Sequence, residues 1–177
     1  METIHTYKVR AKSTRVRSGV VASDRVPEPI RFSAPPEFLG EPQVWTPEHF
    51  FVAALVSCYV STFSGMANAS KFSFASLEVD AEGTVERDAG GWRFTEVRLH
   101  PSVKIEREQD RERAGQLLEK AERSCLIARS ISANVTLVPL VRVAPDQARA
   151  AATNPTSMVA GIGHGTEDSP ATPGNQI

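Results

Sequence analysis

Apolar and polar positions alternate in three short segments before the first long apolar stretch. Strand-forming residues occur over 4–11, near 19–22 and at 30–33. The segment that follows, 34–45, contains three prolines and one glycine, which is typical of an irregular loop. The N-terminal quarter of the chain is therefore predicted to hold three short strands and a loop.

The longest apolar stretch predicts a helix from Pro47 to about Ala67. Thr46 suits the N-cap, Pro47 suits the first helical position, and Glu48 places a negative charge at the positive end of the helix dipole. The residues that follow are apolar on nearly every side, which is typical of a buried helix. We therefore expect this helix to lie at the centre of the fold or of a dimer.

Two alternating segments on either side of a turn at 88–91 predict a long antiparallel hairpin, with strands over 77–85 and 97–105. Trp92 and Phe94 are out of phase with the alternation that follows them. Such a change of phase indicates a β-bulge in the second strand.

A second helix is predicted over 110–124, because five apolar residues share one face: Ala114, Leu117, Leu118, Ala121 and Cys125. A last strand is predicted over 133–143, where Pro139 favours an edge position or a bulge. The order β-β-β-α-β-β-α-β lacks βαβ alternation, so it predicts an α+β fold with mainly antiparallel sheet. Residues 1–145 would form one domain, and the polar segment 146–177 would be a disordered tail.

Composition and charge exclude several classes of protein. The chain is 41% apolar, and its 20 Lys and Arg nearly balance its 21 Asp and Glu, so we expect neither nucleic acid nor a membrane as a partner. No uninterrupted apolar run approaches the roughly 20 residues of a membrane span. The polar start of the chain does not resemble a signal peptide, which predicts a cytoplasmic protein whose thiols are kept reduced.

Cys58 and Cys125, the two cysteines, lie far apart, each in an apolar helical pattern. They could be two small buried apolar residues, a structural disulfide, or a peroxidatic and a resolving thiol. A disulfide-stabilised secreted domain is disfavoured because the chain lacks a signal peptide. The four histidines show no spacing typical of metal ligands, so no metal is expected.

Reduction of a peroxide by a thiol requires more than the thiol itself. The attacking cysteine must be a thiolate near neutral pH, which requires a nearby cation, and arginine is the best suited. A carboxylate should hold the arginine, and a second thiol should resolve the sulfenic acid. The chain offers Cys58, Cys125, Glu48 and the two arginines Arg15 and Arg17.

Two cysteine motifs stand in order along the chain: Thr46-Pro47-Glu48 leading to Ala53-Ala54-Leu55-Val56-Ser57-Cys58, and Ala121-Glu122-Arg123-Ser124-Cys125. They resemble the two cysteine helices of the OsmC/Ohr family, the osmotically inducible protein C and organic hydroperoxide resistance proteins. The resemblance covers about residues 4–143. It implies an OsmC-like fold, an intertwined homodimer with the two long helices at its centre, and thiol-dependent reduction of organic hydroperoxides.

The resemblance also implies roles for individual residues. Cys58 matches the peroxidatic cysteine, Cys125 the resolving cysteine, and Glu48 the carboxylate that holds the arginine. The arginine of the family lies in the N-terminal turn, where Arg17 is favoured slightly over Arg15.

The chain departs from the best-studied branches of the family at two positions. Leu126 follows the second cysteine where those branches have proline, and Tyr59 follows the first where they have phenylalanine. The sequence therefore resembles a generic branch of the family. Ten positions separate Glu48 from Cys58, about 15 Å along a helix axis, so we expect the Glu48 of one subunit to approach the Cys58 of the other.

The predicted function is a cysteine-based peroxidase that acts in defence against oxidative stress. An external dithiol or lipoyl-type reductant would reduce its disulfide, and no metal, flavin or haem would be needed. Four apolar residues could line a pocket for the alkyl hydroperoxide or be plain core: Phe50, Phe51, Phe63 and Met66. The alternative is a non-catalytic dimer that binds a small apolar ligand or senses redox state.

Overall fold

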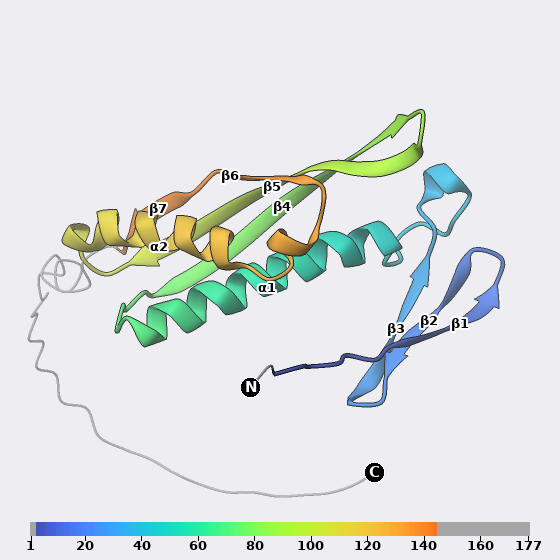
Figure 1. Cartoon of the computed structure of the whole chain (residues 1–177), viewed down its shortest axis with the longest axis horizontal. Helices are drawn as coiled ribbons and strands as arrows, with labels where there is room; N and C mark the ends of the chain where they lie inside the picture. Colours follow the sequence, from blue (N-terminus) through green and yellow to red (C-terminus); the bar gives the residue numbers. More distant parts are fainter. Residues whose placement is uncertain (1–2, 145–177) are drawn as a thin grey trace, which may run out of the picture. The chain divides into compact units, whose positions relative to one another are not determined.

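The chain begins with a three-stranded antiparallel sheet in the computed structural model, which describes residues 3–144 (Figure 1). The strands are β1 (Arg10–Arg15), β2 (Ser18–Ser23) and β3 (Val26–Ser33), in the order β1-β2-β3. We call these three strands the N-terminal sheet. A 3₁₀ turn, η1 (Pro36–Phe38), follows them in the predicted loop. The predicted tail at 146–177 lies outside the described residues.

The predicted first strand over 4–11 is wrong, because β1 begins only at Arg10. A tight turn at Val16 and Arg17 pairs Arg15 with Ser18, and the ladder then runs back until Arg10 meets Ala22 near the end of β2. Residues 3–9 therefore have no partner strand within the described part of the chain, although several of their side chains favour the extended state.

The first helix, α1 (Pro47–Ala69), begins where the sequence predicts. The Thr46 side chain accepts a hydrogen bond from the backbone N–H of His49, with an N···O distance of 3.2 Å. The His49 Nδ1 atom lies 3.2 Å from the Thr46 backbone nitrogen and accepts in return, which completes a capping box. Histidine here takes the place that glutamate or glutamine usually holds.

The single chain covers only one face of α1. The buried residues recur at every fourth position: Leu55, Tyr59, Phe63 and Ala67. The opposite face is exposed and consists of small residues: Ala54, Ser57, Ser61, Ser64 and Gly65. The prediction that α1 is buried on nearly every side is therefore wrong for a single chain.

Helix α1 has a mean hydropathy of 1.7 over 18 residues, so it is apolar enough to cross a membrane. The core helices of soluble proteins pass the same test.

The hairpin prediction is confirmed by β4 (Ser76–Asp88) and β5 (Gly91–Ile105). Their register shifts where Thr84 pairs with Glu96 and Val85 pairs with Phe94, which leaves Thr95 as the extra residue of the predicted bulge.

The predicted last strand is two strands, β6 (Asn134–Leu137) and β7 (Leu140–Val143). Pro139 lies between them, because proline cannot donate to the ladder. Both strands pair with β5 in parallel at the edge of the sheet, which confirms the predicted edge position.

The second helix, α2 (Arg111–Ser124), follows the 3₁₀ turn η2 (Glu108–Asp110) and precedes η3 (Ala128–Ser130). Its predicted apolar face is confirmed as buried: Ala114, Leu117, Leu118, Ala121 and Cys125. Helix α1 packs against α2 and β4, and α2 packs against β5 and β7. These elements form an α+β fold, as predicted, and we call α1 to β7 the core half.

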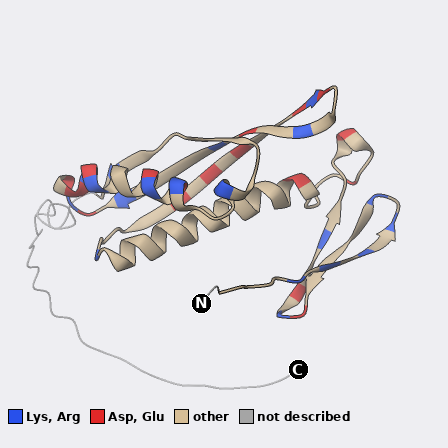
Figure 2. Cartoon of the chain, viewed as in Figure 1, with Lys and Arg blue, Asp and Glu red and all other residues tan. Residues whose placement is uncertain are grey.

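Charge is distributed unevenly between the two helices (Figure 2). The outward side of α2 carries residues of both signs, whereas α1 contains neither lysine nor arginine and only one acidic residue, Glu48, in its first turn. A carboxylate at that end is favoured by the helix dipole.

Candidate functional site

The structure brings together the two cysteines that the sequence separates. Cys58 lies in the middle of α1 and is half-buried, while Cys125 is the C-cap residue of α2 and is fully buried. Both thiols are free, and each lies within hydrogen-bonding reach of the other. The packing of α2 against α1 thus places the two thiols at one site.

Tyr59 fixes the two helices beside the thiols. Its side chain is fully buried, and its hydroxyl donates a hydrogen bond of 3.1 Å to the backbone carbonyl of Leu118 in α2. Burial, together with the negative charge of Glu122, raises the pKa of Tyr59, so the hydroxyl remains a donor. A phenylalanine at this position could not form this link.

The surroundings of Cys58 favour its thiolate. Burial by itself raises the pKa of a thiol, but the backbone N–H of Ile127 and the thiol of Cys125 donate hydrogen bonds to the Cys58 sulfur. The Thr62 hydroxyl and the Leu126 N–H donate to it as well, and the net result is a lowered pKa. Leu126 can donate because it is not the proline of the best-studied branches.

The pKa of Cys125 shifts in the opposite direction, above its ordinary value. Burial raises the pKa of Cys125, and the hydrogen bond and negative charge of Cys58 raise it further, despite opposing hydrogen bonds from the backbone of Ala128 and Ile127. The pair therefore contains one acidic, half-buried thiol and one protonated, fully buried thiol. The thiolate is therefore favoured at Cys58 over Cys125.

Glu48 lies in the first turn of α1, and its Oε2 atom is buried without a hydrogen-bond partner among residues 3–144. It borders a cavity of about 400 Å³ that is otherwise lined by Pro35, Pro36, Glu37, Phe38, Thr46, His49, Val85 and Trp92. Phe38 and Trp92 meet edge to face across this cavity, with ring centroids 5.6 Å apart. The cavity thus combines apolar walls with the carboxylates of Glu37 and Glu48, and the buried Oε2 of Glu48 has no hydrogen-bond partner among residues 3–144.

The two candidate arginines have different partners. One guanidinium nitrogen of Arg17 donates a hydrogen bond of 2.8 Å to the backbone carbonyl of Phe38, at the rim of the cavity that Glu48 borders. Arg15 instead forms an ion pair of 3.3 Å with Glu41. Within one chain the structure therefore places neither arginine, nor Glu48, against the two thiols.

The aromatic residues that the sequence suggests for a pocket are engaged in packing. Phe50 stacks on Trp45 at a centroid distance of 5.8 Å, Phe51 stacks on Phe94 at 4.2 Å, and Phe63 is fully buried. The fourth, Met66, packs against the core. None of these four lines the cavity beside Glu48.

Sequence reasoning missed several groups that the structure places at or near the site. Thr62 is four residues after Cys58 on the same face of a helix, a spacing that could have identified it. Phe38 and Trp92 are large aromatic residues in a loop and beside a turn, where exposure indicates a binding surface. The backbone amides of Leu126 and Ile127 leave no signal in the sequence.

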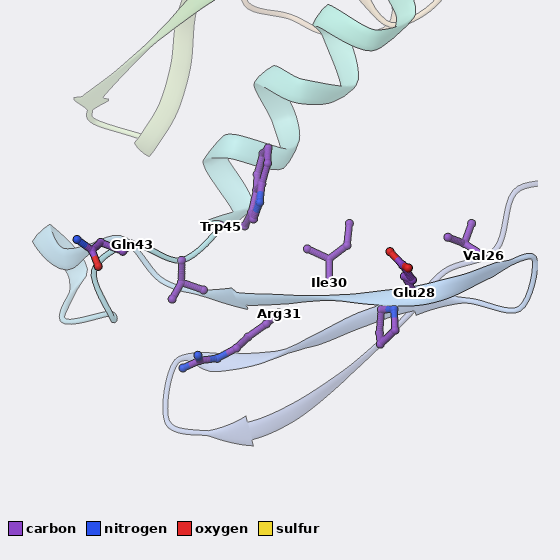
Figure 3. A pocket seen from close by; sticks show the side chains of 8 residues that line it. Val26, Glu28, Ile30, Arg31, Gln43 and Trp45 are labelled. Carbon is purple, nitrogen blue, oxygen red and sulfur yellow. The ribbon is translucent and has the colours of Figure 1, made fainter. Parts of the chain in front are cut away.

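A further cavity lies on β3, away from the predicted site residues (Figure 3). It has a volume of about 500 Å³, and Val26, Ile30 and Trp45 extend on the same side of the strand. All three side chains are at least 46% exposed. Within residues 3–144 no group of three or more His, Cys, Asp or Glu side chains could hold a metal ion.

The sequence profile of OsmC-like proteins matches residues 40–138, which is more than half of the chain, so the chain belongs to this family. The protein YmaD of Bacillus subtilis, whose function is uncharacterised, is 30% identical over 108 residues, which are 59% of this chain and 72% of YmaD.

Solved structures show the same fold. An OsmC-like protein of unknown function from Vibrio cholerae aligns with a TM-score of 0.70 at 22% identity, over 77% of this chain and 100% of the other. An organic hydroperoxide resistance protein OsmC from Legionella pneumophila aligns with a TM-score of 0.65 at 24% identity, over 80% and 100%.

Proposed function

We propose that this protein is a thiol peroxidase that reduces organic hydroperoxides, with Cys58 as the peroxidatic and Cys125 as the resolving cysteine. The observation that carries the proposal is the pair of adjacent free thiols, of which one has a lowered and the other a raised pKa. Relatives of the same fold that are named organic hydroperoxide resistance proteins support it.

The reaction has two steps on the protein. The Cys58 thiolate attacks the distal oxygen of the hydroperoxide, so that an S–O bond forms, the O–O bond breaks, and the alkoxide takes a proton and leaves as alcohol. The sulfur of Cys125 then attacks the Cys58 sulfenic acid, which forms the disulfide and releases water. An external dithiol or lipoyl-type reductant returns both thiols, and no metal, flavin or haem takes part.

A homodimer would complete the site, with Arg17 and Glu48 of one subunit beside Cys58 of the other. Three observations support this arrangement: the buried Oε2 of Glu48 without a partner, the binding of Arg17 at the rim of the same cavity, and the exposed small residues of α1. A Cβ atom added at Gly65 would meet no atom within 4 Å, so this face has room for a second helix. The dimer would work in the cytoplasm, where reduced thiols are maintained.

Thiol counting under stoichiometric peroxide tests the proposal. One equivalent of tert-butyl hydroperoxide should consume both free thiols of the wild type and yield one disulfide. The Cys125→Ser variant should complete one turnover and then retain oxygen on Cys58, which mass spectrometry detects. Repeated turnover by Cys125→Ser would contradict the resolving role of Cys125.

The second candidate is a non-catalytic dimer that binds a small apolar ligand or senses redox state. The cavity that Phe38 and Trp92 help to line favours it, because apolar walls with a few polar groups are typical of ligand sites. Formation of the disulfide without repeated turnover in the presence of excess dithiol would support this candidate over the peroxidase.

A further inference from the structure

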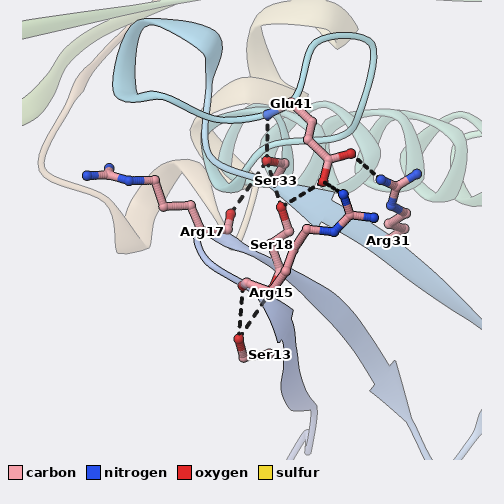
Figure 4. A network of polar contacts seen from close by, with 7 residues as sticks. All are labelled: Ser13, Arg15, Arg17, Ser18, Arg31, Ser33 and Glu41. Atoms are coloured by element: carbon pink, nitrogen blue, oxygen red, sulfur yellow. Dashed lines mark hydrogen bonds and ion pairs between the residues drawn. The ribbon is translucent and has the colours of Figure 1, made fainter.

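A cluster of polar side chains joins the end of β3 to the loop before α1 (Figure 4). The Glu41 carboxylate accepts a hydrogen bond of 3.1 Å from Ser18 and forms ion pairs with Arg15, at 3.3 Å, and with Arg31. The Glu41 backbone N–H donates to the Ser33 hydroxyl at 2.8 Å, and the two serine hydroxyls are 3.1 Å apart. We call Ser18, Ser33 and Glu41 the Glu41 cluster.

The Glu41 cluster surrounds the turn that carries Arg17. The backbone carbonyl of Arg17 accepts a hydrogen bond of 2.8 Å from Ala34, the residue after β3. Gly40 lies directly against Ala34, where a Cβ atom would be 1.6 Å from the Ala34 carbonyl oxygen. The loop therefore folds back on the end of β3 and brings Glu41 to the turn.

Arg17 itself has an unfavourable backbone conformation. Its φ angle is 62°, in the left-handed region that residues other than glycine rarely adopt. Such a conformation persists only where neighbouring contacts hold it, and it commonly occurs at functional positions. Here the Arg17 carbonyl accepts hydrogen bonds from the backbone N–H of Ala34, at 2.8 Å, and from the Ser33 hydroxyl of the Glu41 cluster, at 3.5 Å.

The Glu41 cluster forms ion pairs with two of the three nearby arginines, Arg15 and Arg31, but not with Arg17. Arg15 and Arg31 each form an ion pair with the Glu41 carboxylate. The guanidinium of Arg17 is bound by the neutral carbonyl of Phe38, and it forms no ion pair within the described part of the chain. An arginine that Glu41 holds in an ion pair is directed toward Glu41, so Arg17 is the arginine of these three that is left to approach a thiolate.

We propose that Glu41 is a positioning residue of the thiol site, which holds Arg15 and Arg31 away from it and fixes the turn that presents Arg17 to the Cys58 thiolate. This inference rests on the proposed function, since it assumes that an arginine activates Cys58. Glu41 acts through Arg17 and does not touch the reacting atoms.

The Glu41→Gln substitution removes the charge while it keeps the shape and a hydrogen-bond acceptor for Ser18. It releases two arginines and loosens the turn, so the Cys58 thiolate should be less populated at neutral pH. Asp24→Asn is the matched control, because Asp24 forms an ion pair of 3.1 Å with Arg10 on the same sheet, outside the cluster. The control should leave Cys58 reactivity unchanged.

The test is the rate of Cys58 alkylation against pH in Glu41→Gln, Arg17→Met and the double variant, with Arg15→Met alongside. Arg17→Met and Glu41→Gln should each slow alkylation severalfold at pH 7 and move the midpoint to higher pH. The double variant should be no slower than Arg17→Met alone, because Glu41 acts through Arg17. Arg15→Met should have a smaller effect than either.

The outcomes separate this inference from the proposed function. If Arg17→Met moves the profile but Glu41→Gln does not, or if the two effects add, the role of Glu41 is overturned and the activation of Cys58 by arginine stands. If Arg17→Met leaves the profile unchanged, the arginine of the proposed function fails and the role of Glu41 fails with it. Should Glu41→Gln not fold, Ser18→Ala takes its place in the same cycle.

Discussion

The N-terminal sheet and the core half are stabilised in different ways. Every buried apolar residue of the core cluster falls between Leu55 and Ala133, in the core half. In the N-terminal sheet the buried side chains are the hydroxyl groups of Ser18 and Ser33, while Val26 is 55% and Ile30 is 46% exposed. The core half therefore carries its own core, whereas the sheet depends on strand pairing, the Glu41 cluster and a cover for its apolar residues. In the proposed dimer the second subunit provides that cover.

The largest effect should come from the thiol of the core half. We expect Cys58→Ser to abolish the reduction of organic hydroperoxides, because serine is not ionised at neutral pH and cannot form a sulfenic acid. The circular dichroism spectrum and the oligomeric state should match the wild type. Unchanged peroxide consumption by this variant would place the chemistry elsewhere.

Truncation of an apolar side chain should lower the free energy of unfolding more in the core half than in the N-terminal sheet. Phe63→Ala removes a fully buried ring and should lower the free energy of unfolding by about 3–5 kcal/mol. Ile30→Ala on β3 should lower it by about 1 kcal/mol or less in the single chain. Urea titrations at several protein concentrations measure both.

The dependence of these two losses of stability on protein concentration tests whether a second subunit covers the N-terminal sheet. If a second subunit covers Ile30, the destabilisation by Ile30→Ala should grow as the protein concentration rises. An equal loss for Phe63→Ala and Ile30→Ala at the lowest concentration would show that the N-terminal sheet is as well packed as the core half.

Tyr59→Phe tests the link between the two helices. The substitution removes one buried hydrogen bond to Leu118 and keeps the ring, so we expect the free energy of unfolding to fall by about 1 kcal/mol. The wild-type and variant proteins should differ in urea midpoint but not in the slope of the transition. A variant as stable as the wild type would mean that the hydroxyl does not tie α1 to α2.

Leu126→Pro should produce a smaller change, confined to the thiols. Cys125 already has φ −64° and ψ 121°, a conformation that a following proline tolerates, and Leu126 is 67% exposed. The substitution removes one N–H donor from Cys58, so its pKa should rise and its alkylation at pH 7 should slow by a small factor. Leu126→Ala, which keeps the N–H, is the control and should match the wild type.

The smallest effect should be an acid transition around Glu41, beside the N-terminal sheet. Burial raises the pKa of Glu41, but the hydrogen bond from Ser18 and the charges of Arg15 and Arg31 outweigh it and hold the pKa below its ordinary value. The ionised form is therefore favoured in the folded state, and this stabilisation is present above the ordinary pKa of 4.5 and lost as the pH falls through the lowered value. The amide resonance of Ala34 should follow this change while that of Leu118 does not.

The sequence predicted the core half far better than the N-terminal sheet. Capping residues and apolar periodicity gave both helices, the hairpin and the bulge beside Phe94, because in each the local pattern and the packing agree. The start of β1 at Arg10 depends on where a turn sets the register with β2, and strand propensity does not report this. The sequence left open whether α1 is covered within the chain or by a second subunit, because composition does not distinguish cover by the same chain from cover by another.

The same limit applies to the site. The sequence could name Cys58 and Cys125 and, by resemblance, their partners Glu48 and Arg17. It could not show that the two thiols are adjacent, since this depends on how α1 packs on α2. The roles of the two thiols, of Glu48 and of the arginine stay predictions that the experiments above address.

The hydrogen bonds from the main chain to Cys58 bear on how this site tolerates mutation. The N–H groups of Leu126 and Ile127 belong to the backbone, so only proline can remove them. The exposed side chain of Leu126 can therefore vary in size and polarity, and Ile127, which packs against the core, can be exchanged for other apolar residues, without loss of these donors. Part of the acidity of Cys58 is thus encoded in the path of the chain after α2 rather than in residue identity, which gives the thiol a mutational robustness that an arginine alone could not provide.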